Sequence, residues 1–100
     1  MNVTFTPLAE RQLDDLYEYI ATHADEARAD SYVGRIVAHC ETLKTFPRRG
    51  NKRDDLLPGL RIVGFERRIT IAFVVTTDAV LIEGIFYGGR DIPTAFRAAD

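Results

Sequence analysis

The sequence predicts an α+β fold in which a short strand and a helical hairpin precede a three-stranded antiparallel meander. In residues 8–46 the apolar side chains recur at helical spacing, whereas residues 60–87 hold three short apolar runs separated by hairpin-length turns. One hundred residues is the usual length of one domain, so we assign residues 1–100 to a single domain.

The first strand is predicted at residues 2–6. The chain alternates there, with Val3 and Phe5 on the same face, and Pro7 ends the alternation. Thr6 is suited to cap a following helix, because its hydroxyl accepts a hydrogen bond from a free backbone N–H of the first turn. Pro7 fits the first helical position, since the N–H that it lacks would have no partner there.

Two helices are expected next, at about residues 8–24 and 25–46. Acidic Asp25 and Glu26 favour the start of the second helix through the helix dipole, and Pro47 ends it because proline cannot continue the hydrogen-bond ladder. Almost no linker separates the two helices, so they should form an antiparallel hairpin.

Three strands follow at residues 60–65, 69–75 and 80–87, with tight connections between them that predict an antiparallel sheet. The helical hairpin should cover the face that carries Ile69, Ile71, Phe73, Val75, Val80, Ile82 and Phe86. The opposite face still carries Ala72, Val74, Leu81, Ile85 and Tyr87.

This second apolar face needs a cover, because a sheet facing water normally alternates apolar and polar residues. A partner protein is the cover that we expect, since an uncovered apolar patch on a small domain marks a binding surface. The alternative is that the tail at residues 90–100 folds back and places Ile92 and Phe96 on this face.

Several classes of function find no support in the residues. No phosphate loop, nucleophile elbow or metal-ligand spacing is present, so we expect no cofactor and no metal. Because Cys40 is the single cysteine, an internal disulfide is excluded, and we predict that Cys40 is a small core residue. No long apolar run or signal-like segment occurs, so we expect a cytoplasmic protein without a membrane contact.

Charge is distributed unevenly along the chain. Residues 1–46 carry eight acids and four bases, whereas residues 47–68 carry seven bases and three acids. Arginine binds phosphate or carboxylate groups through two parallel hydrogen bonds, so this basic region is a candidate contact for an anionic partner. A solvated basic loop is the alternative.

The order of these parts resembles the RelE/ParE toxin superfamily of bacterial type II toxin–antitoxin systems. Pro58-Gly59-Leu60-Arg61 stands before the meander, and Tyr87-Gly88-Gly89-Arg90-Asp91 follows it, which looks most like the ParE branch. The resemblance covers nearly the whole chain and implies two helices packed on a twisted antiparallel sheet.

The resemblance also implies a hetero-oligomer with a cognate, ParD-like antitoxin. That partner would bind DNA through its N-terminal part and wrap the toxin with a C-terminal segment that folds on binding, so nucleic acid would be contacted only through the antitoxin. The apolar residues of the second sheet face are the candidates for antitoxin contact: Val74, Leu81, Ile85 and Tyr87.

The two branches of the superfamily differ in target. RelE-like members are ribosome-dependent mRNA endoribonucleases with basic residues on the sheet and often a tyrosine near the C-terminus, whereas ParE-like members are described as DNA gyrase inhibitors without a catalytic set. Arg61 and Arg90 match arginine positions of the nucleases, but Phe96 stands where the tyrosine would fall and cannot transfer a proton.

The resemblance therefore favours a gyrase inhibitor that acts by binding and is not an enzyme. An RNA-cleaving toxin is the alternative, and a non-toxic partner in a DNA-binding antitoxin complex is a third. The candidates for target contact are Arg61, Arg67, Arg68, Arg90, Asp91 and Phe96.

Overall fold

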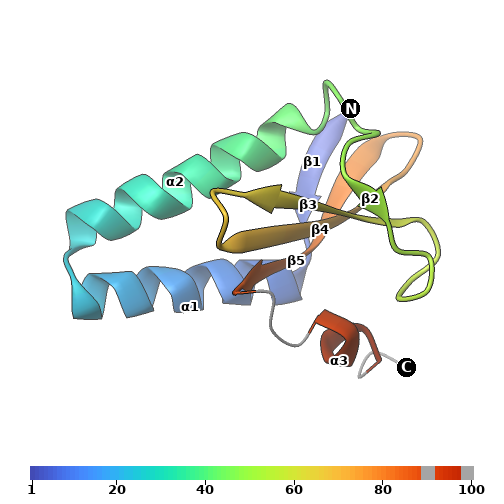
Figure 1. The fold of residues 1–100 in the computed structure, drawn as a ribbon. Coiled ribbons are helices and arrows are strands. Elements are labelled where there is room, and N and C mark those ends of the chain that lie inside the picture. Colours follow the sequence, from blue (N-terminus) through green and yellow to red (C-terminus); the bar gives the residue numbers. More distant parts are fainter. Residues whose placement is uncertain (89–91, 98–100) are drawn as a thin grey trace.

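The computed structural model describes residues 1–88 and 92–97 and confirms the predicted α+β layout (Figure 1). A short strand leads into two long helices, and the remaining strands follow before a final short helix. The elements are β1 (Asn2–Phe5), α1 (Pro7–His23), α2 (Glu26–Thr42), β2 (Asn51–Lys52), β3 (Leu60–Phe65), β4 (Ile69–Val75), β5 (Ala79–Tyr87) and α3 (Ile92–Arg97).

The sheet has five strands in the order β1-β5-β4-β3-β2. Strands β3, β4 and β5 form the predicted antiparallel meander. Strand β1 pairs in parallel with β5, and the helical hairpin lies between β1 and the meander in sequence. The sheet is therefore mixed, with β1 and the two-residue β2 at its edges.

Local signals in the sequence fix the starts of both long helices. The Thr6 hydroxyl accepts a hydrogen bond from the Ala9 N–H at 3.2 Å, and the Asp25 carboxylate accepts one from the Arg28 N–H at 2.7 Å. Helix α2 ends at Thr42, a few residues before the predicted end at 46. Turns that precede Pro47 complete the segment.

The main core lies between the helical hairpin and one face of the sheet. Its buried residues come from α1, α2, β4 and β5, with Leu43 directly after α2, and they pack as a single cluster. The largest of them include Ile36, Leu43, Ile71, Phe73 and Ile82, all of which are fully buried.

A bulge in β5 reverses part of the predicted face assignment. Ala72 lies opposite Gly84 whereas Phe73 lies opposite Ile82, so one extra residue, Glu83, stands in β5. Because side chains alternate with period two, this extra residue exchanges the faces of everything after it. Ile85 therefore packs in the main core, and Phe86 points to the other face, the reverse of the prediction for both residues.

The second face of the sheet is covered by the chain itself. Helix α3 places Ile92 and Phe96 on it, each 8% exposed, and the Phe96 ring lies 6.0 Å from that of Phe86. Leu56 and Leu57, from the loop before β3, complete this second core. The alternative in which the tail folds back is confirmed, so an apolar face left open for a partner is not present at this place.

Candidate functional site

A groove of about 1000 Å³ opens between the helical hairpin, the β3–β4 turn and the end of β5. In Figure 1 the hairpin extends well past the sheet, which leaves this side of α1 without a strand to cover it. The lining comes from five parts of the fold: Gln12, Asp15, Leu16, Tyr19 and Ile20 of α1, Tyr32 of α2, Glu66 and Arg68 of the turn, Ile85, Phe86 and Tyr87 of β5, and Ala95 of α3.

Three tyrosines give this groove the composition of a protein-binding surface. Tyr19 is 59% exposed and Tyr87 is 40% exposed, while Tyr32 is half-buried. A tyrosine ring buries a large apolar area while its hydroxyl stays available for a hydrogen bond, which is why tyrosine is enriched at interfaces. Leu16 and Ile20 supply apolar surface between them, so the groove suits an amphipathic polypeptide segment.

A bidentate ion pair fixes the turn that borders the groove. The Arg35 guanidinium of α2 donates to both carboxylate oxygens of Glu66, at 2.9 and 3.0 Å. These hydrogen bonds from Arg35 lower the pKa of Glu66. The Arg35 guanidinium also lies 5.2 Å from the centre of the Tyr32 ring, so one arginine connects the turn to the groove wall.

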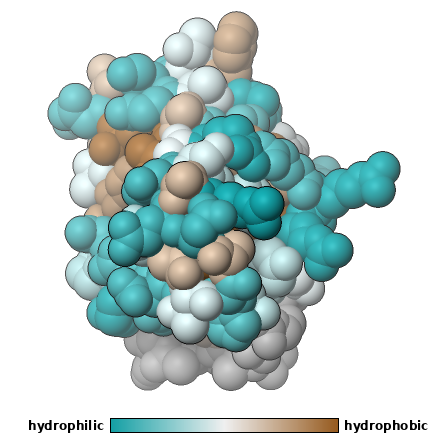
Figure 2. All heavy atoms as spheres, turned by 90° about the vertical axis from the view of Figure 1, so that its left-hand side faces the viewer, coloured by the Kyte–Doolittle hydropathy of each residue, from teal (hydrophilic) through white to brown (hydrophobic). Residues whose placement is uncertain are grey.

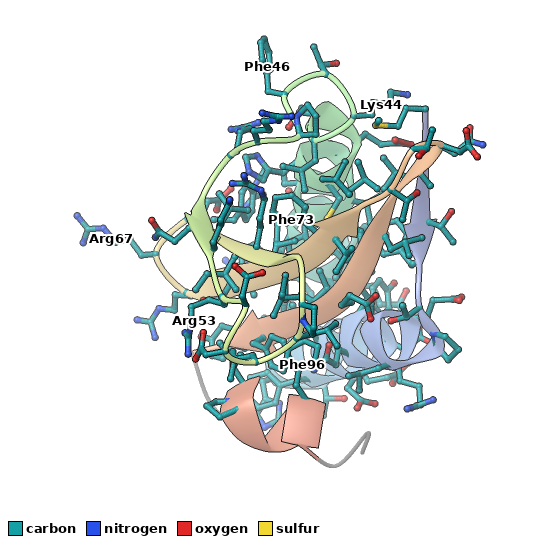
Figure 3. All side chains as sticks on the ribbon, turned by 90° about the vertical axis from the view of Figure 1, so that its right-hand side faces the viewer. Lys44, Phe46, Arg53, Arg67, Phe73 and Phe96 are labelled. Carbon is teal, nitrogen blue, oxygen red and sulfur yellow. The ribbon has the colours of Figure 1, made fainter. Side chains whose placement is uncertain are left out.

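The backbone of the turn is held in an uncommon conformation. Glu66 and Arg67 have φ angles of +46° and +68°, a region that residues with a side chain seldom occupy. The Gly88 N–H donates to the Arg68 carbonyl at 2.7 Å, which ties the turn to the end of β5. Arg67 consequently projects from the body of the molecule, as Figure 3 shows.

The predicted target contacts do not form one cluster. Arg67 and Arg68 lie at the β3–β4 turn, whereas Arg61 lies at the start of β3, roughly 17 Å away at the rise of a β-strand. Phe96 belongs to the second core. Arg90 and Asp91 lie outside the described residues.

Arg61 instead joins a second basic group at the β2 edge. It lies directly opposite Lys52 across the β2–β3 pair, and its guanidinium reaches the Arg49 carbonyl at 3.5 Å. Like charges directly opposite each other in a sheet repel, so this pair has an electrostatic reason to accept an anion.

The predicted antitoxin contacts are also separated by the fold. Ile85 and Tyr87 line the groove. Val74 packs against the second core, and Leu81 is half-buried on β5 outside the groove.

Sequence reasoning did not identify Tyr19, Tyr32 or Arg35. The two tyrosines stand on predicted helices, where a tyrosine is an ordinary residue, and their position beside the groove is tertiary information. The partner of Arg35 is 31 residues away in the chain, so no local pattern joins the two.

Within residues 1–88 and 92–97, no three His, Cys, Asp or Glu side chains lie close enough to hold a metal ion. No helix in the same part of the chain combines the length and apolar character needed to cross a bilayer.

Comparisons with known proteins place this architecture among toxin–antitoxin proteins. This chain is similar to a solved structure described as "Chromosomal ParDE TA system from P. aeruginosa", with 25% sequence identity and a TM-score of 0.75. The similarity covers 87% of this chain and 95% of the other. Residues 3–92 match the family model of the ParE toxin of the type II toxin–antitoxin system parDE. The chain therefore belongs to the ParE toxin family. No match was found among curated proteins.

The expected relationship is thereby confirmed at the level of the family. The chain is a ParE-type toxin of a type II toxin–antitoxin system, and membership of that system supports a cognate antitoxin as its partner.

Proposed function

We propose that this toxin inhibits DNA gyrase by binding to it, with the β3–β4 turn as the principal contact. The observation that carries the proposal is the turn itself, which presents Arg67 and Arg68 on a backbone fixed by the Arg35–Glu66 ion pair. Structure that is strained and held in place by its neighbours is typical of functional sites. Family membership supports a toxic role, and Arg90 and Asp91 are proposed as further contacts.

The groove is proposed as the seat of the antitoxin. Glu66 and Arg68 belong both to the groove lining and to the basic turn. A segment lying in the groove would therefore cover part of the surface that contacts gyrase, and neutralisation would follow from occlusion. We infer an amphipathic segment from a ParD-like, DNA-binding antitoxin, and the complex would act in the cytoplasm, where gyrase works.

The turn is tested by removing its arginines without removing its conformation. Arg67→Gly suits the positive φ, because glycine adopts this region without a steric penalty, and Arg68→Ala is combined with it. The matched control is Arg28→Ala, which removes an exposed arginine from α2 far along the hairpin. Each variant is induced in bacteria that carry a DNA-damage reporter, and each purified protein is added to a gyrase supercoiling assay.

We expect the control to arrest growth, induce the reporter and inhibit supercoiling, and the double variant to do none of these while unfolding at the same temperature as the parent. Full inhibition by the double variant would exclude the turn as the contact. If the parent chain itself does not arrest growth, the third hypothesis is favoured instead, in which the protein is a non-toxic partner in a DNA-binding antitoxin complex.

The groove is tested separately with Tyr19→Ala and Tyr87→Ala. Both tyrosines are exposed, so their removal should leave the fold and the toxicity unchanged. Co-expression with the cognate antitoxin should then fail to restore growth. Normal rescue of both variants would show that the antitoxin binds elsewhere.

A second candidate function is RNA cleavage on the ribosome, favoured by the Lys52–Arg61 juxtaposition. Two cations at this spacing would hold an RNA phosphate. This function predicts growth arrest with a silent DNA-damage reporter and mRNA cleavage during translation that Arg61→Ala abolishes. Intact transcripts during arrest would exclude it.

A further inference from the structure

The two edges of the sheet differ in how they are protected. The β2 edge is only two residues long, and it carries Lys52 opposite Arg61, so its charge discourages pairing with another chain. The β1 edge has four residues, Asn2–Phe5, with neither a charged residue nor a proline among them. An edge of this kind is a template for an additional strand.

The hydrogen bonds of β1 show which backbone groups face outward. The Asn2 N–H donates to the Asp78 carbonyl at 3.1 Å, and the Thr6 N–H donates to the Ile82 carbonyl at 3.0 Å. Backbone groups of successive residues in a strand point to opposite sides, so the even-numbered residues pair with β5. The N–H and C=O groups of Val3 and Phe5 therefore point to the open edge.

An apolar groove of about 570 Å³ runs beside this edge on the helix side of the sheet. Its lining comes from β1, α1 and α2: Val3, Thr4, Phe5, Glu10, Leu13, Asp14, Val33 and Val37. Figure 2 views the hairpin end, and apolar surface gathers at its upper left, on the side away from the hydrophilic side chains that project to the right.

Among the described residues, Glu10 and Asp14 are the charged ones that line this second groove, and both are exposed. Neither forms an ion pair with another residue of the described chain. They stand one helical turn apart on α1, on the side opposite to Leu16 and Tyr19 of the tyrosine groove.

We propose that the β1 edge receives an extended segment of a partner polypeptide as a sixth strand. Its apolar side chains would pack on Val33 and Val37, and its lysine or arginine side chains would reach Glu10 and Asp14. A second copy of this chain fits less well, because antiparallel pairing of two β1 strands would bring the acidic residues of both copies to the same groove. The inference is independent of the toxin's target and of the occupant of the tyrosine groove.

The test is an NMR titration of the full chain with the synthetic peptide Lys-Thr-Val-Thr-Ile-Thr-Lys, acetylated and amidated at its ends. On one face of the peptide, the two lysines flank valine and isoleucine. We expect the amide signals of Val3 and Phe5 to shift and their hydrogen exchange to slow, while the signals of Tyr19 and Tyr87 stay in place. NMR detects millimolar affinity, so absence of shifts at several millimolar peptide would overturn the proposal.

Two control peptides separate the two parts of the argument. Glutamate in place of both lysines tests charge, and N-methylation of the alternate amides that face β1 tests backbone pairing. Equal binding of either control would refute the corresponding part. On the protein, Glu10→Gln combined with Asp14→Asn should weaken the lysine peptide about fivefold, as expected for two surface ion pairs, and unchanged affinity would count against the charge assignment.

Discussion

Replacing Phe96 tests whether this residue is a core residue or a target contact. The side chain is 8% exposed and packs on Phe86 in the second core, with ring planes inclined by 57°. In Phe96→Ala the ring is lost, and α3 keeps Ile92 as its other buried anchor. The structure therefore predicts a loss of stability, even though the position lies in the last few residues of the chain.

The size of this loss follows from burial and from the position of α3. Truncating a core phenylalanine to alanine costs about 3–5 kcal/mol when the surroundings are rigid. Helix α3 has only six residues, so it can undock, which limits the cost to the stabilisation that docking provides. Burying one large apolar side chain contributes about 1.5–3 kcal/mol. We therefore expect Phe96→Ala to lower the unfolding free energy by about 2–3 kcal/mol.

Urea unfolding monitored by circular dichroism measures this difference directly. Phe96→Leu is the matched variant, because it keeps an apolar side chain in the same place and should cost no more than about 1.5 kcal/mol. The leucine variant should retain toxicity, and the alanine variant should lose activity only to the extent that it unfolds. A stable Phe96→Ala protein, within about 0.5 kcal/mol of the parent, that had lost its toxicity would refute the core assignment and restore Phe96 as a contact.

Three further predictions concern other parts of the fold. Gly50 and Gly59 both have positive φ, but a Cβ on Gly50 would lie 2.0 Å from the Ile62 carbonyl oxygen, whereas one on Gly59 would make only an ordinary contact with the Val74 side chain, at 3.8 Å. Gly50→Ala should therefore lower the unfolding free energy by well over the roughly 1 kcal/mol expected for Gly59→Ala. Urea unfolding measures both losses, and equal losses would contradict the clash. Burial, and to a lesser extent the charge of Arg49, lowers the pKa of His39 below 6.5, so the folded state favours the neutral imidazole. The stability that this preference contributes is complete above pH 6.5 and is lost as the pH falls through the folded-state pKa. Thermal unfolding from pH 7.5 to 5 should show it, and His39→Phe should flatten the curve. Burial raises the pKa of the Cys40 thiol to about 12, so a thiol reagent at pH 8 should label it only after denaturation, and rapid labelling of the native protein would show that the site opens.

The sequence determined those features that depend on neighbours in the chain. Thr6 caps α1 as predicted, Asp25 lies at the predicted start of α2, and the starts and ends of the three meander strands lie within one residue of the expected positions. Caps, prolines and hairpin turns act over three or four residues, so a local pattern contains all the information that they need. The order of these parts was also sufficient to indicate the family.

Tertiary structure decided the two faces of the sheet. An alternating pattern contains no signal for an extra residue, so the bulge at Glu83 reversed the faces of Ile85 and Phe86 after an otherwise correct strand. The six residues of α3 are too few to show a helical period, and their docking depends on apolar surface that β3, β4 and β5 provide together.

Tertiary structure also decided which residues come together in the candidate sites. The tyrosine groove joins residues from α1 to α3, the Arg35–Glu66 pair links positions 31 apart, and β1 leaves an open edge because it pairs with β5 on one side only. Composition along the chain indicated basic residues after the helical hairpin, but their division into a turn at Arg67 and an edge group at Arg61 follows from the length of β3. Such contacts arise when distant segments bury surface together, and that free energy is a property of the assembled fold and of no single stretch of sequence.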